Sequence, residues 1–397
     1  MKKILAVVLC LIMALNLVAC GGGSASNSAS GKNVIKIGVF EPQTGENGGG
    51  GLQEVFGIRY ANSIYKTINI NGETYTIELD EQDNKSDKTE AVRAANKLVS
   101  DRVVGVLGSY GSGVSIAAGD IFRDAKIPAI GCSCTNPQVT NGNEFYFRTC
   151  FLDPFQGTVM ANYVKKHGYQ KVAVLTQLGD DYSEGLGSYF VRACEALGIE
   201  VVAKEKFQTN AQDFKAILTN IKNAEPEFIF APSSITSAPL IIEQAKRDLG
   251  ITCQLGGGDT WENGSIIENA HGYADGIVVT TFYDEGAEAT AEGKIFLNGD
   301  GKNANGFSNY LLSIGQPATI PAVSALGYDA YLAMYKAIEL AQSTDGEAIR
   351  EALTKLSYVG VTGDISFNAD GDANKSQAFI KEVENDKFVF KEITSID

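Results

Sequence analysis

The chain has 397 residues, a formal net charge of −15 and 44% hydrophobic residues. This length is comfortable for two domains, and the hydrophobic content is sufficient for well-packed cores. The acidic balance disfavours nucleic acid and anionic lipid surfaces as partners.

The first residues have the pattern of an export signal. Two lysines precede an apolar run from Ile4 to Leu15, and Leu17-Val18-Ala19 stands directly before Cys20. This arrangement resembles a bacterial lipoprotein signal, and the apolar run is too short for a comfortable membrane span. We therefore expect a signal peptide over residues 1–19 and lipid attachment at Cys20. The protein would then be extracytoplasmic and held to the cell membrane, away from ATP and cytosolic cofactors.

The next residues predict a tether. Residues 21–31 contain almost only Gly, Ser, Ala and Asn, and such a segment cannot bury apolar surface. We expect a flexible linker over residues 20–32 and a folded part from near Lys32 to Asp397.

Beyond Cys10 and Cys20, five cysteines remain: Cys132, Cys134, Cys150, Cys194 and Cys253. They form no CxxC pair, and no His spacing suits zinc, so we expect no metal site. Five is an odd number, so at least one thiol is free. The pattern favours small buried side chains, and a disulfide of Cys132 or Cys134 with Cys150 stays open.

In chain order, short apolar runs alternate with amphipathic ones. The predicted strands are Val34–Phe40, Thr74–Asp80, Val103–Leu107, Ile127–Ile130, Val172–Thr176, Glu200–Phe207, Phe228–Phe230 and Ile277–Phe282. The predicted helices include Leu52–Ile68, Thr89–Ser100 and Phe214–Asn223. This alternation predicts an α/β fold with parallel, doubly wound sheets. A weak repeat of strand, polar loop, helix and strand (residues 76–107 and 200–230) favours two similar lobes.

Function is expected at the carboxyl ends of the parallel strands. The loops there are rich in Gly, Ser and Thr, carry a carboxylate or two in three of the six and contain no Lys or Arg; they are 41–51, 108–115, 131–137, 178–183, 232–236 and 256–261. They predict a polar cradle for a small neutral or zwitterionic solute. The 108–115 loop fits neither a P-loop nor a dinucleotide fingerprint. A Ser-rich turn that enters a helix can instead hold a carboxylate, although a purely structural turn stays open.

Short motifs in a fixed order carry a resemblance over nearly the whole mature chain. They include Pro42-Gln-Thr-Gly45, Val106-Leu-Gly-Ser109, Cys134-Thr-Asn-Pro137, Gly257-Gly-Asp259 and Gly327-Tyr-Asp-Ala330. The set resembles the type I periplasmic binding proteins of the branched-chain amino-acid (leucine/isoleucine/valine-binding) group, which serve ABC importers. The resemblance implies two doubly wound lobes joined by a three-strand hinge. Lobe 1 would comprise residues 33–152 and 284–378, and lobe 2 residues 153–283 and 379–397.

By position, the resemblance also implies a site for an amino acid between the lobes. Ser112 and Thr135 fall where a hydroxyl and backbone N–H bind the ligand carboxylate, and Ser133 where a backbone carbonyl accepts from the ammonium. Asp259 falls at the acidic position that pairs with the ammonium, and Tyr182 at an aromatic wall. Ser109 and Ser234 complete the expected ligand-binding set. A zwitterion suits such residues, because unpaired charge in a closed cleft is costly.

Two departures leave the cargo open. The family commonly has an aromatic residue in the first loop, where this chain has Gly48–Gly51, and Ser233-Ser234 replaces an aromatic of some relatives. A branched-chain, small, polar or aromatic amino acid, or a related amide, therefore stays open.

The expected partners are a small-molecule amino acid and an ABC permease, with no cofactor and no nucleic acid, and we expect a monomer. A ligand sensor that signals to a membrane receptor uses the same fold. A hydrolytic enzyme is a remote alternative, because the chain has only His167 and His271 and no GxSxG or HExxH motif.

Overall fold

The computed structural model describes residues 33–302 and 304–395, and residues from Val34 onward form one compact unit. The predicted signal peptide, the lipidation site Cys20 and the 20–32 linker lie outside the described residues. Within the described residues, no helix is both long and apolar enough to cross a membrane.

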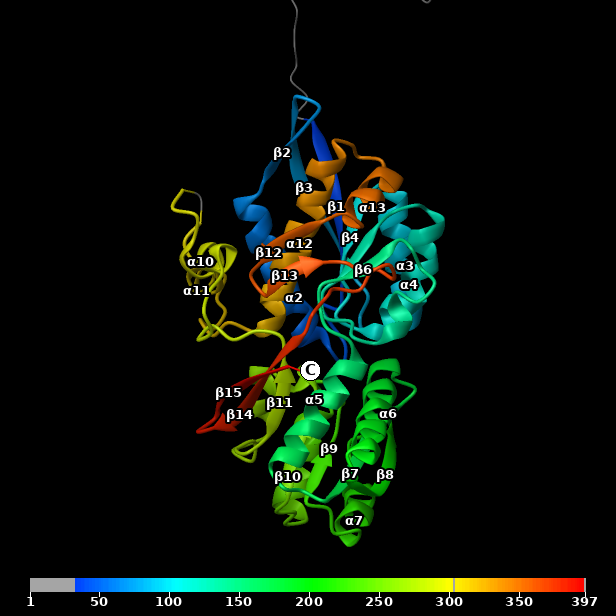
Figure 1. The fold of residues 1–397 in the computed structure, drawn as a ribbon, viewed down its shortest axis with the longest axis vertical. Helices are drawn as coiled ribbons and strands as arrows, with labels where there is room; N and C mark the ends of the chain where they lie inside the picture. Colours follow the sequence, from blue (N-terminus) through cyan, green and yellow to red (C-terminus); the bar gives the residue numbers. More distant parts are fainter. Residues whose placement is uncertain (1–32, 303, 396–397) are drawn as a thin grey trace, which may run out of the picture. The chain divides into compact units, whose positions relative to one another are not determined.

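The first sheet has six strands in the order β2-β3-β1-β4-β5-β6, parallel except for the edge pair β2–β3 (Figure 1). Its elements are β1 (Val34–Glu41), α2 (Gly48–Ile64), β2 (Thr67–Ile70), β3 (Glu73–Asp83), α3 (Lys88–Ser100), β4 (Gly105–Leu107), α4 (Ser112–Asp124), β5 (Ala129–Gly131), η1 (Pro137–Val139) and β6 (Tyr146–Arg148). The parallel order places the carboxyl ends of β1, β4 and β5 side by side, and the loops that follow these strands carry the predicted serines and threonine.

Alternation along β1 explains how helices cover both faces of this sheet. Ile35, Ile37 and Val39 pack in the core cluster that contains residues of α2 and α12, whereas Phe40 packs with side chains of α3 and α4. Figure 1 shows α2 and α12 adjacent to one another, and α3 adjacent to α4. The near-continuous apolar run of β1 is therefore a consequence of burial on both faces.

The second sheet has seven strands in the order β15-β14-β11-β10-β9-β7-β8, parallel from β8 to β11 and antiparallel at β14 and β15. Its elements are α5 (Asp153–Lys166), β7 (Lys171–Leu178), α6 (Asp181–Ala196), β8 (Glu200–Gln208), α7 (Lys215–Asn223), β9 (Phe228–Phe230), α8 (Ala238–Glu243), η2 (Gln244–Asp248), β10 (Gln254–Gly257), η3 (Asp259–Trp261), α9 (Gly264–Asn269), β11 (Val278–Thr281), β14 (Gln377–Glu384) and β15 (Lys387–Ser395).

Between β11 and β14 the chain forms α10 (Ala291–Asn298), α11 (Phe307–Ser313), α12 (Ala322–Ala341), α13 (Gly346–Leu353) and the hairpin β12 (Ser357–Gly360) and β13 (Gly363–Ser366). The long α12 packs against α2 of the first lobe. The predicted α/β fold with parallel-dominated sheets in two lobes is thus confirmed. The lobe boundaries given above stay predictions.

One predicted helix has other bounds in the structure, and the favoured prediction for the cysteines, small buried side chains, agrees with it for four of the five. The predicted helix Leu52–Ile68 begins earlier, at Gly48, and ends at Ile64, because Thr67–Ile70 forms the edge strand β2. The disulfide left open for Cys150 is not formed: Cys132, Cys134, Cys150, Cys194 and Cys253 are free thiols, and all but Cys253 are buried.

Candidate functional site

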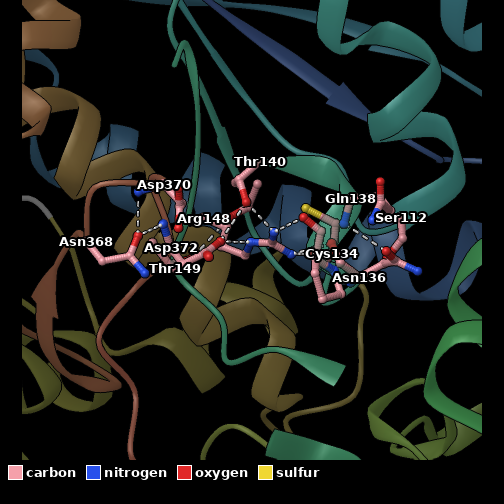
Figure 2. Close-up of polar contacts among 12 residues, drawn as sticks. Ser112, Cys134, Asn136, Gln138, Thr140, Arg148, Thr149, Asn368, Asp370 and Asp372 are labelled. Carbon is pink, nitrogen blue, oxygen red and sulfur yellow. Dashed lines mark hydrogen bonds and ion pairs between the residues drawn. The ribbon is translucent and has the colours of Figure 1, made fainter. Parts of the chain in front are cut away.

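A buried arginine fixes the loop that follows β5. Arg148, at the end of β6, donates through Nη1 to the carbonyl oxygens of Cys134 and Asn136, at 2.7 Å each. Its Nε forms an ion pair with Asp372 Oδ1 at 2.7 Å, and its Nη2 donates to Thr140 Oγ1 at 2.6 Å (Figure 2). One guanidinium thus satisfies oxygens of several segments in a fixed geometry. The loop that carries Ser133 and Thr135 is held rigidly for this reason.

Ser112 connects this loop to the amino terminus of α4. Its Oγ accepts from the backbone N–H of Asn136 at 3.2 Å (Figure 2), and the side chain is buried. The preceding residue, Gly111, supplies no side-chain cap to α4. The first turn of α4 therefore retains N–H groups at the positive end of the helix dipole, as a carboxylate site requires.

Asp259, directly after β10, is the predicted ammonium partner, and two donors hold it. Its Oδ1 accepts from Gln156 Nε2 at 2.8 Å and from the Tyr182 hydroxyl at 2.9 Å. Within the described residues its Oδ2 makes no hydrogen bond. Burial raises the pKa of Asp259 to about 6. The structure thus brings Tyr182 and Asp259 together and leaves one carboxylate oxygen available.

The loops of the two sheets are in direct contact. The Asn136 side-chain amide donates to the carbonyl oxygen of Asp181 at 2.7 Å, and Lys88 forms an ion pair with the Asp181 carboxylate at 2.7 Å. The backbone N–H of Asp153 donates to the carbonyl oxygen of Thr135 at 3.0 Å. These contacts bring the predicted residues of the first sheet to the same region as those of the second.

Most of the remaining predicted site residues form hydrogen bonds with other groups of the protein. The Ser109 hydroxyl accepts from Asn84 Nδ2 at 3.0 Å and lies 3.4 Å from Glu41 Oε2. The Ser234 hydroxyl donates to Ser237 at 2.9 Å. Ser133 donates through Oγ to Glu54 Oε1, whereas Thr135 Oγ1 is buried without a hydrogen-bond partner.

Sequence reasoning missed several polar groups of this region. Gln156 orients Asp259, and both carboxylate oxygens of Asp153 are buried with no hydrogen-bond partner among residues 33–302 and 304–395. Burial raises the pKa of Asp153 to about 8. Both residues lie in the first turn of α5, and that position in the sequence gives no sign of a contact between Gln156 and Asp259.

Gly48–Gly51, which were expected in the first loop, form the first turn of α2, and the Tyr110 ring lies against Gly50. A Cβ placed on Gly50 would lie 2.4 Å from Cε2 and Cζ of Tyr110. Tyr110 is held through its backbone N–H, which donates to Glu41 Oε2 at 2.7 Å. The close approach of the Tyr110 ring thus requires the absence of a side chain at Gly50.

Glu41, Glu54 and Cys132 are buried and have ligand atoms within 4.8 Å of one another, a spacing that a metal ion requires. Burial raises the pKa of the Cys132 thiol well above its usual value, so the thiol is neutral in the metal-free protein. We interpret the group as a buried carboxyl pair beside a neutral thiol.

A separate cavity of about 490 Å³ lies elsewhere in the chain and is lined by residues that include Cys150, Phe282, Val361, Lys375 and Phe379. None of the predicted ligand-binding residues lines it. The candidate site is therefore the polar region that joins the two sheets.

The two α/β lobes meet through polar contacts. One lobe has an oriented carboxylate and the other a helix terminus without a side-chain cap. These features are typical of a two-lobed solute-binding protein. A family model described as periplasmic binding protein matches residues 34–387. The chain belongs to this family, as the sequence motifs predicted, and membership implies an extracytoplasmic location.

Known proteins resemble the chain over most of its length. A leucine-, isoleucine-, valine-, threonine- and alanine-binding protein of Pseudomonas aeruginosa is 27% identical over 352 residues, 88% of this chain and 90% of the relative. A leucine-binding protein from Thermotoga maritima has a TM-score of 0.82 at 32% identity, over 91% of this chain and 99% of that one. A branched-chain amino-acid transporter substrate-binding protein from Streptococcus pneumoniae, solved with isoleucine, has a TM-score of 0.80 at 28% identity, over 92% and 100%.

Proposed function

We propose that this protein is the substrate-binding component of an ABC importer and that it binds an amino acid between its two lobes. The observation that carries the proposal is the hydrogen bonding of the Asp259 carboxylate. Tyr182 and Gln156 both donate to one oxygen, and the other makes no hydrogen bond within the described residues. A carboxylate held in this way is prepared to receive a ligand ammonium.

The complementary end of the ligand is assigned to the first lobe. Ser112 and Thr135, with the N–H groups at the start of α4, would receive the ligand carboxylate. The Ser133 carbonyl would accept from the ammonium together with Asp259. Tyr182 would form a wall beside the ligand, and Ser109 and Ser234 would support the loops on either side. The relatives with leucine and isoleucine in their names support an amino acid as the cargo.

Ligand contacts from both lobes would favour a closed form that docks on the permease. Lipid attachment at Cys20 would keep the protein beside that permease. Metabolic labelling with a fatty acid tests the attachment: the wild-type protein should be labelled and membrane-bound, and Cys20→Ala should be neither. A labelled Cys20→Ala protein would contradict the assignment.

A thermal-shift panel of all amino acids and small amides on the mature protein tests the binding function. A ligand at a hundredfold excess over its Kd stabilises the folded state by about 2.7 kcal/mol, so at least one compound should raise the Tm clearly. A panel without any shift would refute an amino-acid or amide cargo. Turnover of a compound would favour an enzyme instead.

A further inference from the structure

Glu41 and Glu54 are fully buried and lie next to one another. Glu54 Oε1 accepts from the Ser133 hydroxyl, and Glu41 Oε2 accepts from the backbone N–H of Tyr110 at 2.7 Å. Within the described part of the chain, the other two oxygens, Glu41 Oε1 and Glu54 Oε2, are buried without a hydrogen-bond partner. A buried carboxylate oxygen without a donor is costly, so this pair requires a proton or an external donor.

The basic side chains that are buried in the described part of the chain are engaged elsewhere. Their partners are Asp372 for Arg148, and Glu262 and Asp284 for Lys381. No buried basic group of the described residues is thus available to neutralise Glu54. Leucine, or another amino acid with an aliphatic side chain, would not neutralise Glu54 either, because its single ammonium is already assigned to Asp259.

The Tyr110 hydroxyl is a third polar group of this region that a ligand could bind. Its ring lies against Gly50, the residue is only 5% exposed, and its hydroxyl makes no hydrogen bond within the described residues. Burial, with Asp259 and Glu54 as the next contributors, raises the pKa of Tyr110 well above its usual value. The hydroxyl therefore remains protonated and can both donate and accept. It lies 2.9 Å from the ideal Cβ position of Gly50, one helical turn before Glu54 on the same face of α2.

We propose that Glu54 and the Tyr110 hydroxyl form a second polar subsite that receives a cationic, nitrogen-bearing group on the side chain of the ligand. The inference rests on the proposed function, and it narrows the cargo from any amino acid to a basic one. An ammonium or guanidinium supplies both the charge and the N–H donors that the pair lacks. The competing arrangement is a proton shared between Glu41 and Glu54, which would satisfy the pair without a ligand and leave an aliphatic preference.

Calorimetric titration of the mature protein with lysine, arginine, glutamine and leucine tests the subsite. Lysine or arginine should bind at least about tenfold more tightly than leucine, the ratio expected from one charge-assisted hydrogen bond. Glu54→Gln should reduce the preference for the basic ligand over leucine, the ratio of the two affinities, at least about tenfold. Glu78→Gln, the same substitution at an exposed position of β3, is the matched control and should bind like the wild type.

Tighter binding of leucine than of lysine and arginine by the wild-type protein would overturn the subsite and leave the amino-acid function standing. Binding of a basic ligand that Glu54→Gln leaves unchanged would also overturn it. If Glu54→Gln does not fold, Tyr110→Phe replaces it, because it retains the ring and removes only the hydroxyl; it should weaken the basic ligand selectively, and equal effects on lysine and leucine would contradict the subsite. Failure of every amino acid to bind would refute the proposed function itself.

Discussion

The Tyr182 hydroxyl donates to Asp259 Oδ1 at 2.9 Å. The two residues are far apart in sequence, one in the first turn of α6 and the other after β10. A Cβ on Gly258 would lie 2.1 Å from this hydroxyl, so the glycine before Asp259 is what permits the contact. The carboxylate is thus oriented before any ligand arrives, which lowers the cost of ordering the site on binding.

Asp259→Asn should weaken amino-acid binding about 10- to 150-fold, because a hydrogen bond to a charged group contributes about 1.5–3 kcal/mol. Tyr182→Phe should have a smaller effect, since it removes one donor to Asp259 and retains the ring. Isothermal titration of the three proteins with the tightest ligand of the panel measures both changes. Unchanged affinity in Asp259→Asn would refute the ammonium assignment.

The ligand-free protein should lose stability as the pH rises from about 5 to 8. Burial raises the pKa of Asp259 to about 6 and that of Asp153 to about 8, whereas an unfolded Asp titrates near 3.9. The folded state therefore retains protons that the unfolded state has already released. The resulting stabilisation is complete below about pH 4 and is lost through these higher pKa values. Thermal unfolding across this pH range should show a falling Tm.

Ligand affinity should rise with pH over the range in which the stability of the ligand-free protein falls. An ammonium prefers the ionised form of Asp259, so binding should strengthen as the pH rises through about 6. Asp259→Asn is the control, because its affinity should lose this rise. A wild-type affinity that is constant from about pH 5 to 7 would contradict the pairing.

The secondary structure was predictable where burial alone determines the pattern. Phe228–Phe230 was predicted as a strand from its apolar run, and β9 has the same bounds. The strand β10 was not predicted, because Gly256 and Gly257 remove the apolar signal. Gly257 is required there, since a Cβ would lie 2.2 Å from the Trp261 ring. Glycines at close tertiary approaches thus conceal strands from pattern reasoning.

For the candidate site, loop residues were easier to predict than residues inside helices. Ser112, Thr135 and Asp259 follow strands, where the fold class places a ligand. Glu54 lies in the middle of α2 and has the sequence context of a solvated helical residue, yet it is fully buried against Ser133. Gln156 is similar in α5. Such roles depend on which elements pack together, and local sequence does not contain that information.

Gly50→Ala should destabilise the protein by about 1–3 kcal/mol, the usual cost of overpacking, because the new Cβ would lie 2.4 Å from the Tyr110 ring. The effect should disappear in a Tyr110→Ala background, where that space is empty. Gly264→Ala is the matched control, since a Cβ there meets nothing within 4 Å. Chemical denaturation of the four variants measures the coupling. Additive effects of Gly50→Ala and Tyr110→Ala would show that the ring does not pack on this glycine.

Arg148→Met should cost about 3–5 kcal/mol of stability, because it leaves the buried Asp372 without its ion-pair partner. The carbonyl oxygens of Cys134 and Asn136 would also lose their donor, so the loop with Ser133 and Thr135 should lose its fixed geometry. Ligand affinity should therefore fall together with stability. Arg93→Met is the control: Arg93 is 71% exposed and pairs only with Glu90 on the surface of α3, and such a pair contributes about 0–1 kcal/mol. If Arg148→Met retained wild-type affinity while unfolding more easily, Arg148 would support the fold alone and not the arrangement of the binding loop.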